Sequence, residues 1–141
     1  MSKRKVCVVI NNRANYARIK SALSAMKKNK KIKLQIVLGS SAILNRYGSV
    51  SNIIKSDGFK INHIVYTLVE GENLLTMAKS TGLSIVEYST VFNYLKPDIV
   101  LVIADRYETL AAATAASYMN ILLAHTQGGE VTGSIDESVR H

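Results

Sequence analysis

The side chains best suited to acid–base chemistry gather in the last third of the sequence. Asp105 and Arg106 follow the apolar run 99–103, and a second polar group begins at His125, after the apolar run 121–124. A carboxylate or an imidazole held beside a substrate can take up and release a proton. In an α/β sheet, ligands bind where buried strands end. We therefore expect these two strand ends to form one wall of a site for a small anionic ligand.

The second polar group supports more than one interpretation. His125 is either a ligand-binding residue or a histidine satisfied within the core, and Gly128 and Gly129 suit either a close approach to a ligand or an ordinary tight turn. Asp105 likewise suits both the ligand crevice and the N-cap of the helix that follows it. Asp136 opens a helix, where acids are expected on electrostatic grounds. No Cys and His spacing indicates a zinc site, so we expect no metal.

The net charge of +8 is concentrated in the first third of the chain. Eleven of the eighteen Lys and Arg residues lie between Lys3 and Lys33, and no acid precedes Asp57. One interpretation is a surface that binds nucleic acid. The other is a solvated helix face together with an anionic small-molecule substrate, and it is favoured because the basic tract lacks alternating aromatic residues. Arg13, at the start of the first predicted helix, either binds a phosphate together with helix N-terminal amides or is simply exposed.

The length and composition are those of a single globular domain. The chain has 141 residues, of which 48% are apolar, enough to bury a sizeable core. No apolar run reaches the roughly 18 residues that cross a membrane, and the one after the basic first residues is too short for a secretion signal. We therefore expect a cytoplasmic protein without a membrane partner. The single cysteine, Cys7, falls in a predicted strand and is expected to be buried.

Apolar patterns predict alternating strands and helices. A continuous β-branched run predicts a strand at 5–10, mostly apolar segments predict strands at 32–38, 99–103 and 121–124, and partial alternation predicts one at 61–68. Helical spacing predicts helices at 14–26, 48–56 and 105–118, and between 73 and 95 it predicts either two helices or one helix with a break at Gly82. Ser134 and Glu137 have the spacing of a capping box, which predicts a further helix start. This alternation indicates right-handed βαβ units and an α/β fold with a doubly wound parallel sheet. The first strand is not followed by a G-x-G-x-x-G dinucleotide fingerprint.

Five segments together resemble one protein family. They are N-R-A-N-Y at 12–16, L-G-S at 38–40, L-K-P-D-I-V at 95–100, D-R-Y-E-T-L-A-A-A at 105–113 and H-T-Q-G-G-E-V-T-G-S-I-D-E-S-V-R-H at 125–141. These segments are similar to the N-terminal part of the UDP-N-acetylglucosamine 2-epimerases, in particular the hydrolysing enzymes of sialic acid biosynthesis. The resemblance implies that residues 1–141 are a truncated Rossmann-like N-terminal domain of a two-domain GT-B fold. The second domain, which holds most of the nucleotide, is then absent from this chain.

The resemblance also implies a reaction. Members of this family remove the C2 proton of UDP-N-acetylglucosamine and expel UDP, after which water adds and N-acetylmannosamine is released without a metal or redox cofactor. Asp105 and Asp136 match proposed acid–base residues, and Arg13 matches a phosphate-contacting arginine. We therefore predict a hydrolysing UDP-N-acetylglucosamine 2-epimerase whose catalytic residues are Asp105, Asp136, Gln127 and Glu130. The predicted substrate-binding residues are Arg13, Arg106, His125, Gly128, Gly129, Ser134 and Arg140.

The sequence departs from the family pattern at three positions. Asn15 stands where an acid is frequent, and Ala104 stands where glycine is frequent. Gln127 matters more, because many members carry a catalytic glutamate there and an amide cannot exchange a proton as a carboxylate does. Either Glu130 or another group then takes that role, or the substrate is a UDP-2,4-diacetamido-trideoxy sugar of the legionaminic acid pathway. A non-catalytic module that binds a sugar nucleotide or nucleic acid is the alternative from a different functional class.

The same resemblance sets expectations for partners. A UDP-sugar is the expected substrate, and nucleic acid is not an expected partner. The full-length protein is expected to form a homo-oligomer. The 141-residue chain alone is expected to be inactive, because half of the cleft of a two-domain enzyme is missing from it.

Overall fold

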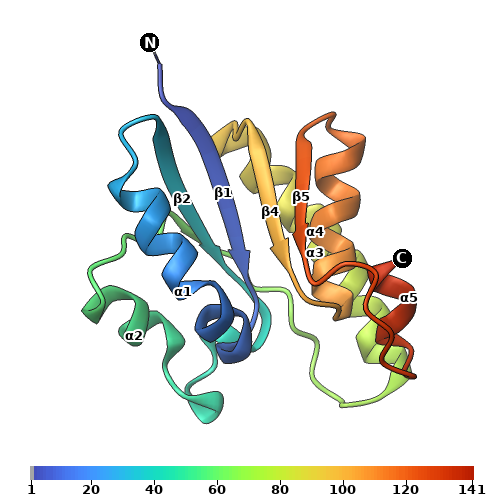
Figure 1. The fold of residues 1–141 in the computed structure, drawn as a ribbon. Helices are drawn as coiled ribbons and strands as arrows, with labels where there is room; N and C mark the ends of the chain where they lie inside the picture. The colour runs from blue at the N-terminus through green and yellow to red at the C-terminus, as the bar shows by residue number, and fades with distance from the viewer. Residues whose placement is uncertain (1) are drawn as a thin grey trace.

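Strand β1 lies at the centre of a five-stranded parallel sheet with strand order β3-β2-β1-β4-β5 (Figure 1). The computed structural model describes residues 2–141. Residues 6–10 are all buried, which is why this central strand is a continuous apolar run rather than an alternating one. The elements in chain order are β1 (Arg4–Ile10), α1 (Arg13–Lys28), β2 (Ile32–Leu38), the 3-10 turns η1 (Ser40–Ile43) and η2 (Asn45–Tyr47), α2 (Val50–Ser56), β3 (His63–Ile64), α3 (Leu74–Leu95), β4 (Ile99–Ile103), α4 (Tyr107–Tyr118), β5 (Leu122–Thr126) and α5 (Asp136–Arg140).

Helices cover both faces of the sheet, which confirms the predicted doubly wound α/β fold. On one face, α1 and α2 pack against alternate strand residues such as Val8 and Ile10. On the other face, α3 and α4 pack against the intervening residues Cys7 and Val9, and α4 does so with a row of buried alanines. Burial raises the pKa of the Cys7 thiol to about 12. Cys7 is therefore an uncharged core residue, as predicted from its place in the strand.

Side-chain caps define the starts of the two longest helices. Asn12 is the N-cap of α1, and its side chain accepts a hydrogen bond from the Asn15 backbone N–H at 2.8 Å. Asn73 caps α3 through reciprocal hydrogen bonds with Thr76. Each such cap stabilises its helix by about 1 kcal/mol. Helix α3 continues without interruption through Gly82, so the break predicted at Gly82 was wrong.

Two predicted boundaries near the sheet were wrong. Strand β3 spans only His63–Ile64 rather than 61–68, because it pairs with β2 at the last two residues of that strand and then leaves the sheet. Helix α4 begins at Tyr107 rather than at Asp105, and Arg106 stands at its N-cap without a side-chain cap bond. Asp105 is therefore not the cap of α4.

The predicted capping box of Ser134 and Glu137 was also wrong. Helix α5 begins at Asp136, and its N-cap is Ile135, which makes no side-chain cap bond. The Glu137 carboxylate instead accepts hydrogen bonds from the backbone amides of Thr132 and Gly133, the second at 2.7 Å. Gly133 has a φ of 71°, and the turn that it makes directs these amides at the carboxylate. Glu137 thus orders the loop before α5 rather than capping the helix.

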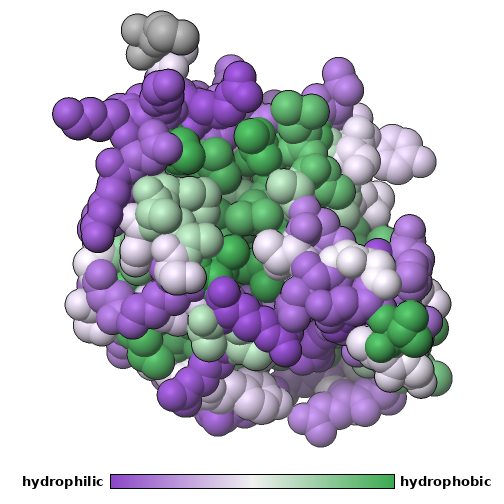
Figure 2. All heavy atoms as spheres, viewed as in Figure 1, coloured by the Kyte–Doolittle hydropathy of each residue, from purple (hydrophilic) through white to green (hydrophobic). Residues whose placement is uncertain are grey.

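One face of β4 and β5 has no covering helix within residues 2–141. Leu122 in β5 is 66% exposed, and its register partner Ile99 in β4 is only partly buried. Figure 2 shows apolar atoms exposed over this part of the molecule. None of the helices in the described chain combines the length and the apolarity needed to cross a membrane.

Candidate active site

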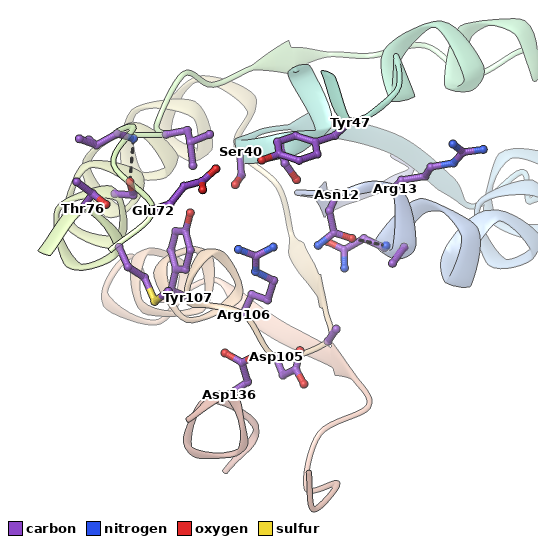
Figure 3. Close-up of a pocket in the computed structure, with 18 of the residues that line it drawn as sticks. Asn12, Arg13, Ser40, Tyr47, Glu72, Thr76, Asp105, Arg106, Tyr107 and Asp136 are labelled. Atoms are coloured by element: carbon purple, nitrogen blue, oxygen red, sulfur yellow. Dashed lines mark hydrogen bonds between the residues drawn. The ribbon is translucent and has the colours of Figure 1, made fainter. Parts of the chain in front are cut away.

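A cleft of about 650 Å³ lies beyond the carboxyl ends of β1, β2 and β4 (Figure 3). Its walls come from the residues that follow β1 and β2, from residues 104–107 after β4, and from Asp136 in α5. The segment that leads into α3 closes the opposite side with residues between Leu68 and Ser80. Parallel strands end at the same edge of a sheet, so segments far apart in sequence meet here.

The cleft carries both cations and carboxylates. Four arginines line it: Arg13, Arg18, Arg46 and Arg106. Arg13 opens α1 and extends along the outer edge, whereas Arg106 points toward the middle of the cleft (Figure 3). Arg46 donates to Glu70 Oε1 at 2.7 Å on the far wall. Because a guanidinium matches the oxygens of a phosphate, and α1 adds the positive end of its dipole, this cleft suits a diphosphate.

Asp105 is held on the cleft wall by Arg140. Arg140 Nε donates to Asp105 Oδ2 at 2.7 Å, and Nη2 donates to the same oxygen. The Arg140 side chain is only 6% exposed, and its Nη1 also donates to Glu130 Oε2 at 2.5 Å and to the Gln127 carbonyl oxygen at 3.0 Å. Because both contacts with Asp105 use Oδ2, Arg140 leaves the other carboxylate oxygen open.

The predicted site residues fall into three groups. Arg13, Asp105, Arg106 and Asp136 line the cleft, as expected for a shared site. Gln127, Glu130 and Arg140 form the hydrogen-bonded network that backs Asp105. The cleft lining does not include His125, Gly128, Gly129 or Ser134. In the described chain, no three His, Cys, Asp or Glu residues are placed to hold a metal ion.

His125 and Gln127 shape the loop after β5. His125 Nε2 donates to the Ala104 carbonyl oxygen at 2.5 Å, and this bond joins the end of β5 to the end of β4. Of the two interpretations of His125, this contact agrees with a histidine satisfied within the fold. Arg18 Nη1 donates to Gln127 Oε1 at 3.1 Å, so the amide is engaged by a cleft arginine. Ala104 and Gln127 have φ values of 66° and 62°. A left-handed alanine is strained by about 1–2 kcal/mol, which explains why glycine suits the position of Ala104.

A buried polar layer beneath the cleft was not predicted from the sequence. Glu108 is 1% exposed, and its Oε1 accepts a hydrogen bond from Ser40 Oγ at 2.6 Å. Tyr88 Oη donates to Asn11 Oδ1 at 2.5 Å. Burial, followed by the nearby charge of Glu108, raises the pKa of Tyr88 above its usual range, so the phenol remains protonated. An acid in the first turn of a helix is ordinarily exposed, so the sequence carries no signal for the burial of Glu108.

The far wall, between Leu68 and Ser80, was also missed. Glu70 and Glu72 flank Gly71 in a loop, and Thr76 belongs to the cap of α3. In the sequence, these residues have the pattern of an ordinary helix start. The wall forms because α3 packs on the same face of the sheet as α4.

Comparison with known protein families identifies the kind of protein to which this fold and cleft belong. The family model described as UDP-N-acetylglucosamine 2-epimerase matches residues 24–141. The chain belongs to this 2-epimerase family. The motif resemblance seen in the sequence is thereby confirmed.

Two relatives within the family match nearly the whole chain. A protein of Campylobacter jejuni described as GDP/UDP-N,N'-diacetylbacillosamine 2-epimerase (hydrolyzing) is 34% identical over 100% of this chain and 37% of its own length. A protein of Legionella pneumophila described as UDP-N,N'-diacetylbacillosamine 2-epimerase (hydrolyzing) is 36% identical over 98% of this chain and 37% of its own length. The chain therefore spans a little over a third of the length of these 2-epimerases.

Solved structures of the family share the fold. The UDP-GlcNAc 2-epimerase of Neisseria meningitidis, crystallised with UDP-GlcNAc, superposes with a TM-score of 0.80 at 20% identity over 96% of this chain and 37% of the other. The Rossmann-like architecture of a GT-B-type 2-epimerase is thus confirmed for the described residues.

Proposed function

We propose that this chain forms one wall of the active site of a hydrolysing 2-epimerase that acts on a UDP-linked 2-acetamido sugar. The observation that carries the proposal is the presence of Asp105 and Asp136 on the wall of one cleft that arginines also line. Carboxylates supply proton transfer, and the arginines supply the charge that a leaving diphosphate needs. Two relatives named as hydrolysing 2-epimerases support the same assignment.

The proposed reaction has two steps. In the first, one carboxylate takes the proton from C2 of the sugar while the bond between C1 and the diphosphate oxygen breaks, and UDP leaves with the electron pair. In the second, water adds its oxygen to C1 and gives one proton to a carboxylate, and C2 is protonated on the face opposite to the one that lost its proton. Asp105 and Asp136 are the acid–base residues in this scheme. Arg106, which points into the cleft, stabilises negative charge on the departing diphosphate.

Two sugars are candidate substrates. UDP-N-acetylglucosamine follows from the resemblance of the sequence motifs to the enzymes of sialic acid biosynthesis. A UDP-2,4-diacetamido-trideoxy sugar is supported by the two relatives at 34% and 36% identity, both described as acting on N,N'-diacetylbacillosamine nucleotides. The departure at Gln127 from the catalytic glutamate of many family members agrees with a substrate other than UDP-N-acetylglucosamine. We therefore place the diacetamido sugar first.

Release of UDP by the full-length protein tests both the reaction and the sugar. The two UDP-sugars are supplied in parallel, UDP is measured by a coupled assay, and the free sugar is identified by NMR. UDP-glucose, which has no acetamido group, is the matched control and should yield no UDP. Turnover of one acetamido sugar at least tenfold above the other assigns the substrate. Absence of UDP release from both refutes the proposed function, and salt-sensitive binding to unrelated DNA in that case favours the nucleic-acid module.

A further inference from the structure

Glu108 is a buried carboxylate that the proposed reaction does not use. It lies in the first turn of α4, beneath the cleft, and its side chain is 1% exposed. A carboxylate in such a place is strongly destabilising unless other groups compensate its charge. The groups that surround the Glu108 carboxylate and compensate its charge therefore indicate its role.

The two oxygens of Glu108 face different parts of the cleft wall. Oε1 accepts the hydrogen bond from Ser40 Oγ at 2.6 Å, at the end of β2. Oε2 is buried and receives no hydrogen bond from the described residues. The cation beside Oε2 is Arg106, whose Nε lies 3.6 Å away. Glu108 therefore links residues that follow β2 and β4, and both of those residues line the cleft.

Arg106 is oriented by its surroundings. Its guanidinium lies over the ring of Tyr107, 5.6 Å from the ring centre, and Nε is the nitrogen that faces Glu108. The side chain is nevertheless 47% exposed and points toward the middle of the cleft (Figure 3). With Nε directed at the carboxylate, the two terminal nitrogens are free for a ligand. Those nitrogens present donors in the fixed fork that matches two phosphate oxygens.

We propose that Glu108 is a positioning residue that holds the Arg106 guanidinium in the cleft for the diphosphate of a nucleotide sugar. The inference rests on the proposed function only in the choice of a nucleoside diphosphate as the ligand. Glu108 does not touch the ligand and acts through Arg106. The hydrogen bond from Ser40 Oγ engages the other oxygen of the carboxylate.

Binding of UDP to the full-length protein tests this role without relying on turnover. Glu108→Gln keeps the shape and an oxygen for Ser40 but removes the charge that faces Arg106. We expect the Kd for UDP, measured by calorimetry, to rise about tenfold, as it should for Arg106→Gln, since each removes one charge-assisted contact. The double variant should bind no more weakly than Arg106→Gln alone. Additive losses would show that Glu108 acts independently of Arg106 and would overturn the proposal.

Two further measurements separate positioning from a general loss of structure. Glu87→Gln, on α3 and outside the cleft, is the matched control and should leave the Kd unchanged. If Glu108→Gln does not fold, Arg106→Lys provides the test, because lysine can pair with Glu108 but cannot present the fork. Wild-type affinity in Arg106→Lys would overturn the proposal, and so would the absence of UDP binding to the wild type. UDP binding without turnover of any UDP-sugar would refute the proposed function alone.

Discussion

Asp105→Asn in the full-length protein separates the acid–base role of this carboxylate from its structural contacts. The substitution keeps the size of the side chain and an oxygen that can accept the hydrogen bonds of Arg140. It removes the ability to take up a proton. We expect kcat to fall at least about 100-fold, the usual contribution of a positioned acid–base group, which corresponds to about 2.7 kcal/mol of activation free energy.

The structural cost of the same change should be smaller. Arg140 retains its contacts with Glu130 and with the Gln127 carbonyl oxygen, so its charge is not left without partners. Weakening of the hydrogen bonds to one charged group lowers the free energy of unfolding by about 1.5–3 kcal/mol at most. The variant should therefore remain folded under assay conditions, with a modest decrease in Tm.

UDP release at saturating substrate is the assay, and Asp98→Asn is the matched control. Asp98 stands immediately before β4, at the end of the strand opposite Asp105, and its carboxylate accepts the Lys5 backbone N–H at 2.7 Å. That variant should retain wild-type kcat. Turnover of Asp105→Asn within a few-fold of the wild type would remove Asp105 from the acid–base role. Equal losses in the two variants would attribute the effect to the strand rather than to the cleft.

Two predictions concern stability. A Cβ added at Gly39 would lie 2.8 to 3.0 Å from three side-chain atoms, whereas one at Gly82 meets nothing within 4 Å. Gly39→Ala should therefore lower the free energy of unfolding by about 1–3 kcal/mol in urea denaturation, while Gly82→Ala should preserve or raise it, and equal effects would contradict the packing argument. Hydrogen bonds from Lys20 and then Tyr16 lower the pKa of Asp57, so its carboxylate stabilises the fold above its unfolded pKa near 3.9 and loses this effect as the pH falls through the lower folded value. The Tm of Asp57→Asn should lie below that of the wild type at pH 7 and equal it in strong acid. A difference in Tm that does not change with pH would show that ionisation of Asp57 does not contribute to stability.

The fold class followed from the sequence because the relevant signals are local. The continuous apolar run at 5–10 and the mostly apolar segments at 32–38 and 99–103 predicted strands, and all three were found within a residue of those bounds. The boundaries that failed depend on tertiary contacts. Strand β3 is short because only two of its residues reach β2, and α5 lacks its predicted cap because Glu137 bonds to the loop before it. Neither contact has a signature in the nearby sequence.

For the candidate site, the local sequence shows which chemical groups are available and at which strand ends they lie. Asp105, Arg106 and Arg13 were predictable because parallel strands place their carboxyl ends at one edge. The partners of these groups depend on how distant segments pack together. The tertiary structure placed Arg140 against Asp105 rather than in the cleft lining, and it buried Glu108 beneath Arg106. Burial and charge pairing depend on the packing of segments distant in the chain, and composition and spacing do not encode those contacts.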